Sequence, residues 1–336
     1  MSVILRSLSP FRWIIFTFGR LLSYPFYKLK AFKVQDPSRG DTESDRAISH
    51  KHCTLQEGKL GRCSKYPTVI TYRHIRADAE AEIPIPKFGE VIYISKGEFI
   101  TRGGTAILER LPSGNVVKTP TPNPYFLQEE DDCRRNMRLE ALIYKTINGH
   151  PRVPKCIDWD PTTCCLTIEY LVNGDLREYV KRNHETITAD LRRKWAKQAA
   201  EGLRILHCLD IIHCDISPRN FLLDPNLDLK ISDFAGSSLL GSMPSAFSNT
   251  RYRHPNCNWD VPRFEDDIFG LGSLIYFIMT SDYPFAEVPS DEVETLYKRL
   301  EFPDVCHIAC GSIIEQCWFQ TVDATDVYEY FKVMDD

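Results

Sequence analysis

The feature that most constrains this chain is a pair of short polar runs separated by an apolar hairpin. The first run, HCDISPRN at residues 213–220, places an Asp and an Asn five residues apart. The second run, ISDFAG at residues 231–236, carries another Asp thirteen residues after that Asn. The apolar segments between them flank a turn at 224–226 and predict two short strands. Two carboxylates and an amide on neighbouring loops can hold divalent cations against a polyphosphate and accept a hydroxyl proton.

Composition is that of an ordinary soluble globular protein. The 336 residues are enough for one large domain or two, with 43% hydrophobic and 26% charged residues. A net charge of −5 gives no reason to expect nucleic acid as a partner. The twelve cysteines are scattered, without a Cys-x-x-Cys motif, and several lie within apolar segments. Buried free thiols in a reducing compartment are therefore expected, which favours a cytoplasmic location.

The first 34 residues differ from the rest of the chain. They contain six positive charges and no acidic residue, and apolar side chains recur at helical spacing between Leu8 and Leu22. Their arginines interrupt every apolar run well short of the ~18 residues that a membrane span requires. We expect residues 1–34 to form a basic amphipathic segment that makes peripheral contact with a membrane. A helix packed on its own domain and a disordered leader are the alternatives.

Membrane binding by this segment can be measured directly. Vesicles with anionic lipids are expected to retain the full-length chain and not a chain that begins at residue 35, because only the former carries the basic residues. Vesicles of neutral lipid serve as the control in a co-sedimentation assay. Equal partitioning of the two chains would refute the anchor.

Domain organisation follows from shifts in composition. Residues 35–94 begin as a polar stretch of mixed charge, which suits a linker, and apolar residues return from about residue 66 as an extended lead-in. Over residues 95–336, strand-like segments come first and helical ones later. This order predicts an α+β fold with a small β-rich lobe over about 95–171 and a larger helical lobe over about 172–336.

The small lobe contains a glycine turn that suits phosphate binding. Gly103, Gly104 and Thr105 lie between two predicted strands, and backbone N–H groups in such a turn can approach a phosphate. Two adjacent glycines also occur in simple hairpin turns, so this reading stays open.

A lysine and a glutamate in the same lobe predict a buried ion pair. Lys118 follows two β-branched residues on a strand that should be buried, where an unpaired ammonium is costly. Glu140 lies among the apolar positions of a helix predicted over 132–147, whereas the acidic residues 129–132 form a solvated run. Glu140 is therefore the candidate partner of Lys118.

These runs together resemble the sequences of protein kinases. HCDISPRN is similar to the kinase catalytic loop, and Asp233-Phe234 to the start of the metal-binding Asp-Phe-Gly segment. The strand that ends near Leu171, followed by the Asn-Gly-Asp-Leu run at 173–176, looks like the hinge. Asp267, which begins an apolar helix, matches the central helix of the large lobe, and the resemblance implies that it anchors the backbone of the catalytic loop. The resemblance covers about residues 95–336, with the landmarks in the correct order, and implies the bilobal kinase fold.

The resemblance implies an ATP-dependent protein kinase that uses Mg²⁺. Asp215 would orient the attacking hydroxyl and accept its proton. Asn220 and Asp233 would bind the metal ions, and Lys118, paired with Glu140, would hold the α- and β-phosphates. The substrate would be a protein hydroxyl, with Ser or Thr favoured because most protein kinases act on them.

The nucleotide's other contacts are implied in the same way. Backbone groups of Glu169 and Leu171 would bind the edge of adenine, Asp175 would reach the ribose, and the glycine turn at 103–105 would cover the phosphates. Ile168 would be the gatekeeper that narrows the back of the site.

The chain departs from the family at positions close to the chemistry. Cys214, Ser217, Ala235 and Asn256 stand where Arg, Lys, Gly and Glu are usual. Arg219 occupies the position where many tyrosine kinases place a charge that stabilises the γ-phosphate. The Arg that is missing before Asp215 normally receives a phosphate on the activation segment, so switching by that modification should be weak or absent.

Two other functions are compatible with these residues. A pseudokinase or ATP-binding interaction module is supported by the sparse glycine turn and by the departures above. A small-molecule phosphotransferase resembling aminoglycoside or choline kinases would share the His-x-Asp, Asn and Asp arrangement. The Gly-Asp-Leu run and the helix that begins near Asp267 favour a protein kinase over the latter.

Overall fold

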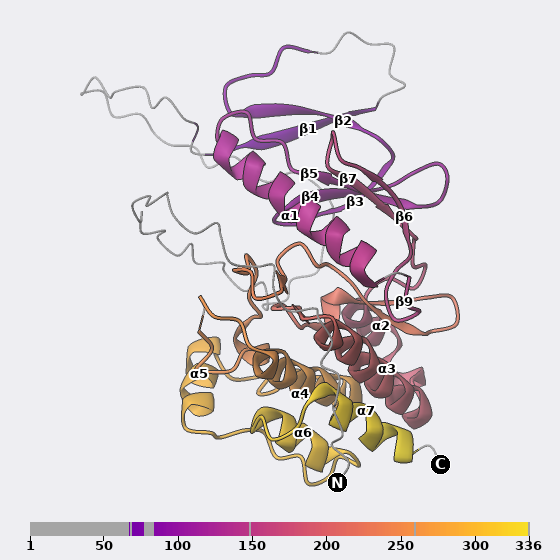
Figure 1. The fold of residues 1–336 in the computed structure, drawn as a ribbon, viewed down its shortest axis with the longest axis vertical. Helices are drawn as coiled ribbons and strands as arrows, with labels where there is room; N and C mark the ends of the chain where they lie inside the picture. Colours follow the sequence, from indigo (N-terminus) through magenta and orange to yellow (C-terminus); the bar gives the residue numbers. More distant parts are fainter. Residues whose placement is uncertain (1–66, 68, 77–83, 148, 259, 335–336) are drawn as a thin grey trace, which may run out of the picture. The chain divides into compact units, whose positions relative to one another are not determined.

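The computed structural model describes residues 67, 69–76, 84–147, 149–258 and 260–334 (Figure 1). The basic segment 1–34 and most of the predicted linker lie outside these residues. No helix in the described part of the chain has the length and apolar character needed to cross a bilayer.

The first lobe is built on a five-stranded antiparallel sheet. Its strands, in spatial order, are β3 (Glu98–Arg102), β4 (Ala106–Arg110), β5 (Val116–Pro120), β7 (Cys165–Ile168) and β6 (Cys156–Asp160). The strands predicted for β3, β4, β5 and β7 are thus confirmed, whereas β6 was not predicted. The register places Lys118 of β5 opposite Leu108 and Leu166, so its ammonium emerges from the middle of the sheet.

Helix α1 (Leu127–Ile147) packs against strands β5, β6 and β7 (Figure 1). It begins five residues before the predicted start at residue 132, so the acidic run 129–132 lies within its first turns. Negative side chains are stabilised there by the partial positive charge of a helix N-terminus. The Asn123 side chain accepts hydrogen bonds from the N–H groups of Tyr125 and Phe126 just before the helix.

Part of the predicted lead-in is folded onto this lobe. Strands β1 (Thr71–Arg76) and β2 (Glu90–Ser95) pair in parallel, and Val91 and Tyr93 of β2 are buried. The Tyr72 hydroxyl donates to the Pro122 carbonyl at 2.9 Å, and the Tyr125 hydroxyl accepts from the Gly89 N–H at 2.8 Å. Ordered structure therefore extends into the segment that the sequence assigned to the linker.

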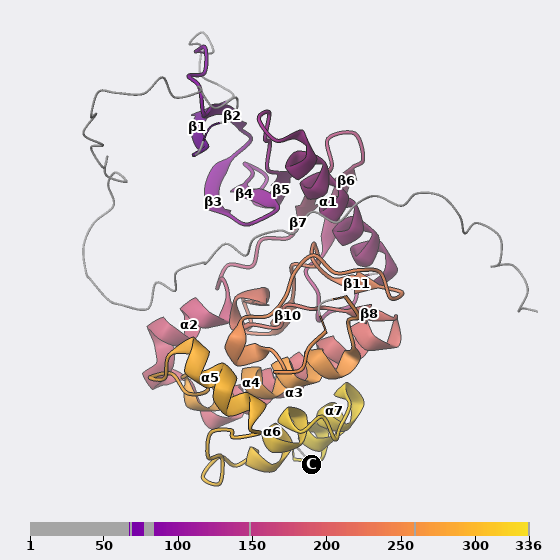
Figure 2. The same ribbon diagram turned by 90° about the vertical axis from the view of Figure 1, so that its left-hand side faces the viewer.

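The second lobe consists mainly of helices (Figure 2). They are α2 (Leu176–Asn183), α3 (Ala189–Cys208), α4 (Phe264–Thr280), α5 (Ser290–Lys298), α6 (Gly311–Trp318) and α7 (Ala324–Val333). Two antiparallel strand pairs lie among them, β9 (Phe221–Leu223) with β10 (Leu229–Ile231), and β8 (Ile211–Ile212) with β11 (Ser238–Leu239). The hairpin predicted between the two polar runs is the β9–β10 pair. The described residues therefore form the bilobal α+β fold that the sequence predicts.

Helix α4 fixes the position of the HCDISPRN loop at residues 213–220. The helix is buried along most of its length. A Cβ on Gly270 would lie 2.8 Å from the Cβ of Ile216, so only glycine allows this approach of helix and loop. Asp267 of α4 accepts from the backbone N–H of His213 at 2.7 Å and from that of Cys214 at 2.9 Å. The sequence prediction that Asp267 anchors the loop backbone is confirmed.

Candidate active site

The Lys118 ammonium joins the two lobes at the centre of the site. Its Nζ lies 2.7 Å from Glu140 Oε2 and 2.7 Å from Asp233 Oδ1. Lys118 and Glu140 are buried, with 4% and 0% of their surface exposed, whereas the Asp233 side chain is 51% exposed. The predicted pair of Lys118 with Glu140 is confirmed, and the contact with Asp233 was not predicted.

Electrostatics keep Lys118 and Asp233 charged. Burial alone would lower the pKa of Lys118, but the carboxylates of Asp233 and Glu140 outweigh it and raise that pKa. The ammonium in turn holds the pKa of Asp233 below its ordinary value. A lysine that is cationic and fixed between two carboxylates can bind phosphate oxygens without first being ordered.

The two polar runs meet through a network of hydrogen bonds. The Ser232 N–H and hydroxyl both donate to the Asn220 carbonyl, at 2.8 and 3.1 Å. The His213 ring lies between the runs, with Nε2 3.0 Å from the Ser232 carbonyl, and its Nδ1 accepts from the Asp215 N–H at 3.2 Å. His213 is fully buried, and its ring centroid lies 5.7 Å from that of Phe234. It is therefore a packing residue.

Asn220 orients the Asp215 carboxylate and keeps its own amide oxygen available. Its side-chain N–H₂ donates to the Asp215 carbonyl at 2.7 Å and to Asp215 Oδ2 at 3.0 Å. The amide oxygen of Asn220 is then directed to other partners. Together with the half-exposed carboxylate of Asp233, it supplies the hard oxygen ligands that Mg²⁺ prefers. The residues present therefore fit the predicted metal site.

Asp233 has a backbone conformation that is uncommon for residues other than glycine. Its φ is +69°, in the left-handed region. Strained conformations of this kind persist where the surrounding structure fixes them, and they cluster at functional sites. Ala235, which replaces the usual Gly, is not among the residues with positive φ. The next residue, Gly236, is required by packing, because a Cβ there would lie 2.1 Å from the Cβ of Ala246.

A cavity of about 300 Å³ opens between the lobes in front of these groups. Apolar side chains from both lobes, including Ala106, Val116 and Leu222, form its walls, as a flat heterocycle requires. The predicted site residues that line the cavity are Gly103, Gly104, Thr105, Lys118, Glu140, Glu169, Leu171, Asp175, Arg219, Asn220 and Asp233. The cavity and its polar groups fit a purine nucleotide with its polyphosphate.

Hydrogen bonds at the hinge narrow down which backbone groups of Glu169 and Leu171 can bind adenine. The Glu169 N–H already donates to the Lys155 carbonyl at 2.9 Å, and its carboxylate accepts from the Lys155 N–H and pairs with the buried Lys230. The Leu171 carbonyl accepts from the Gly174 N–H at 3.0 Å. The backbone groups that can still bind the edge of adenine are therefore the Glu169 carbonyl and the Leu171 N–H. Nothing in the sequence indicated the ion pair with Lys230.

Asp175 has a structural role in addition to the predicted contact with ribose. Its Oδ1 accepts from the Glu178 N–H at 2.9 Å and caps the N-terminus of α2. The residue also lines the cavity, so its second oxygen is the one that can reach a sugar hydroxyl.

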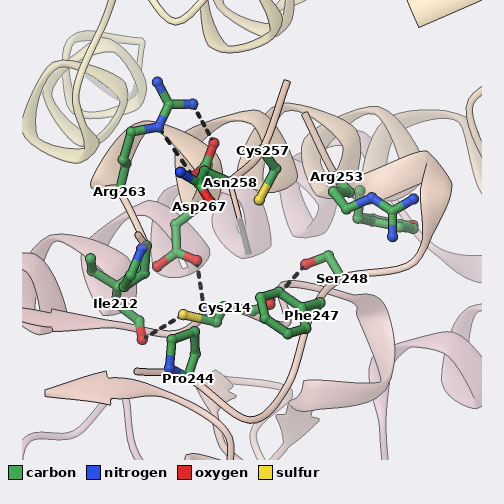
Figure 3. A pocket seen from close by; sticks show the side chains of 13 residues that line it. Ile212, Cys214, Pro244, Phe247, Ser248, Arg253, Cys257, Asn258, Arg263 and Asp267 are labelled. Carbon is green, nitrogen blue, oxygen red and sulfur yellow. Dashed lines mark hydrogen bonds and ion pairs between the residues drawn. The ribbon is translucent and has the colours of Figure 1, made fainter. Parts of the chain in front are cut away.

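Backbone hydrogen bonds hold the activation segment, from Asp233 to about Pro255, against the catalytic loop. The Ser248 N–H donates to the Cys214 carbonyl at 2.9 Å, and the Leu240 N–H to the Asp210 carbonyl at 2.9 Å. A small cavity beneath the segment is lined by Cys214, Ser248 and Cys257 among others (Figure 3). Burial raises the pKa of the Cys214 thiol, which is therefore neutral at pH 7. A neutral thiol cannot form an ion pair with a phosphate on the segment.

Arg251 secures the end of the activation segment. The family's usual Glu is Asn256 here, and Arg251 takes part in a different set of contacts nearby. Its guanidinium donates to the Pro284 and Phe285 carbonyls, both at 3.0 Å, and to the Ser290 hydroxyl at 3.1 Å. No sequence pattern indicated this role, because every residue type has the same backbone carbonyl acceptor.

Comparison with known proteins agrees with this geometry. The sequence model of the protein kinase domain matches residues 125–320, which is more than half of the chain. The chain therefore belongs to the protein kinase family.

Individual relatives include kinases of both acceptor classes. Tyrosine-protein kinase HTK16 of Hydra vulgaris is 27% identical over 250 residues, which cover 70% of this chain and 31% of the relative. The cell cycle serine/threonine-protein kinase CDC5/MSD2 of Saccharomyces cerevisiae is 26% identical over 226 residues (62% and 30%). The probable serine/threonine-protein kinase MARK-C of Dictyostelium discoideum is 22% identical over 293 residues (81% and 35%). The matched region spans about a third of the length of these relatives.

Proposed function

We propose that this protein is an active protein kinase that transfers the γ-phosphate of Mg²⁺·ATP to a hydroxyl of a protein substrate, with Ser or Thr the favoured acceptor. The observation that carries the proposal is that the structure places the lysine and the carboxylates of the site in fixed contacts. Lys118 is ion-paired with both Glu140 and Asp233, and Asn220 holds the carboxylate of Asp215. An arrangement fixed before substrate arrives is what phosphoryl transfer needs, since positioning and electrostatics supply most of its acceleration.

Each residue has a distinct task in this mechanism. Asp215 accepts a hydrogen bond from the substrate hydroxyl, aims its oxygen and takes its proton. Lys118 neutralises charge on the α- and β-phosphates. Asn220 and Asp233 would hold the Mg²⁺ ions, and the bound ions would supply positive charge beside the polyphosphate.

Purified full-length protein tests the proposal in two assays. Transfer of labelled phosphate from Mg²⁺·ATP to generic protein substrates should be detectable, and it should depend on Asp215. Thermal unfolding with and without Mg²⁺·ATP reports binding separately. Stabilisation by the nucleotide without any labelling would overturn the catalytic proposal and favour a pseudokinase.

Arg219 is proposed to stabilise the γ-phosphate and to favour the charged form of Asp215. Burial raises the pKa of Asp215, and the hydrogen bond from Asn220 and the charge of Arg219 oppose that rise. A base works only when deprotonated, so activity should appear as the pH rises through the pKa of Asp215. In Arg219→Gln the opposing charge is lost, that pKa rises further, and the acid limb of the rate profile should move to higher pH.

The profile of phosphate transfer against pH, at saturating Mg²⁺·ATP, measures this shift. Arg177→Gln is the matched control, because Arg177 is not among the main groups that shift the pKa of Asp215 and its guanidinium lies 3.7 Å from Glu178. An acid limb that stays in place in Arg219→Gln would contradict the role assigned to this charge.

A further inference from the structure

Three potential metal ligands meet on a loop of the second lobe, outside the active site. Asp304, Cys306 and His307 lie between α5 and α6, and one donor atom from each lies within 4.8 Å of the others. Carboxylate oxygen, thiolate sulfur and imidazole nitrogen are the three ligand types that bind Zn²⁺ in proteins. All three side chains are exposed, so an ion can reach them from solvent.

The distances between the donor atoms match those around one tetrahedral ion. Cys306 Sγ lies 3.2 Å from Asp304 Oδ2, and His307 Nε2 lies 3.3 Å from the same oxygen and 3.7 Å from the sulfur. Zn–ligand bonds of about 2.0–2.3 Å at tetrahedral angles separate neighbouring donors by about 3.3–3.6 Å. His307 Nδ1 is nearer to the sulfur, at 2.9 Å, and rotation of this exposed ring can present either nitrogen.

The backbone that carries these side chains is fixed from the inside. Val305, which lies between Asp304 and Cys306 in the sequence, is 2% exposed and belongs to the core. A Cβ on Gly311 would lie 2.1 Å from the Val305 carbonyl oxygen, so the start of α6 is pressed against the loop. The Cys306 N–H donates to Asp304 Oδ1 at 2.9 Å, which leaves Oδ2 directed at the thiol. Binding an ion here therefore requires little ordering of the chain.

We propose that Asp304, Cys306 and His307 bind a divalent cation of the zinc class, with water as the fourth ligand. The thiol proton is lost to solvent on binding, since the thiolate is the ligand. The Asp304 carboxylate and the Cys306 thiolate then balance the two charges of the ion. The neutral imidazole of His307 is the third protein ligand. The site is independent of the ATP cavity and of the proposed kinase activity.

Metal titration of the full-length protein tests this site. Protein stripped with a chelator and kept reduced is titrated with Cd²⁺ and with Zn²⁺, following the Cd–thiolate charge-transfer absorbance and the heat of Zn²⁺ binding. The expected result is one equivalent of tight binding that disappears in Cys306→Ser. Affinity should fall by more than about 10-fold in Asp304→Asn and in His307→Ala, because loss of a ligand costs at least as much as loss of its supporting hydrogen bonds.

The other thiols require a matched control. Cys208→Ser removes another exposed free cysteine and should keep the tight equivalent unchanged. Stabilisation of the Cys306→Ser variant by Mg²⁺·ATP, if equal to that of the unsubstituted protein, shows that the variant is folded. Equal affinity and stoichiometry in Cys306→Ser and the unsubstituted protein would overturn the proposal, as would retention of the tight equivalent in both Asp304→Asn and His307→Ala.

Discussion

Replacement of Asp215 by Asn is expected to lower phosphate transfer by about 10²-fold or more, the usual contribution of a positioned general base. The substitution keeps the shape of the side chain and its contact with Asn220, which lies 3.0 Å from Asp215 Oδ2. It removes the negative charge that orients the substrate hydroxyl and accepts its proton. The rate of label transfer per mole of protein, at saturating Mg²⁺·ATP, measures the loss.

The same variant should bind nucleotide almost as well as the unsubstituted protein. Asp215 is not among the residues that line the ATP cavity, so the thermal stabilisation by Mg²⁺·ATP should be preserved. A large loss of rate with binding retained is the signature of an interaction made in the transition state. If both proteins transfer label equally fast, Asp215 is not the catalytic carboxylate.

Replacement of Lys118 by Met is expected to reduce transfer by roughly 10²–10³-fold, the effect of removing one preorganised charge donor. It should also destabilise the fold by about 3–5 kcal/mol, because Glu140, which is fully buried, is left without its partner. Asp233 loses the same contact but is half-exposed, so solvent screens most of its cost. Urea unfolding and the transfer assay measure the two effects separately.

A double variant separates the stability of the pair from its function. In Lys118→Met with Glu140→Leu, no buried charge is left unpaired, so much of the lost stability should return. Transfer should stay low, because neither variant can hold the α- and β-phosphates. If the single variant proves as stable as the unsubstituted protein, Glu140 does not depend on Lys118. Recovery of transfer in the double variant would contradict the phosphate-binding role.

Much of the candidate site could be predicted from the sequence because its residues belong to short local patterns. The buried position of Lys118 followed from the β-branched residues before it, and the inward position of Glu140 from its apolar neighbours on a helix. The β9–β10 hairpin followed from two apolar segments around a turn. Local spacing determines such elements, so they can be read one segment at a time.

Contacts between distant segments could not be predicted in this way. Lys118 and Asp233 are 115 residues apart in the sequence, and Lys230 and Glu169 are 61 apart. The start of α1 was placed too late, because an acidic run is equally compatible with a solvated loop and with the first turn of a helix. Arg251 was overlooked because its partners are backbone carbonyls that no residue type reveals.

The sequence alone determined the kind of protein, since the order and spacing of Lys118, Glu140, Asp215, Asn220 and Asp233 fix which chemistry is available. Tertiary structure decided how those groups are used. Packing of the lobes brings the Asp233 carboxylate to 2.7 Å from the Lys118 ammonium, and it holds the activation segment by backbone hydrogen bonds. The physical reason is that side-chain identity is a local property, whereas hydrogen bonds and ion pairs depend on distances that only the folded chain sets.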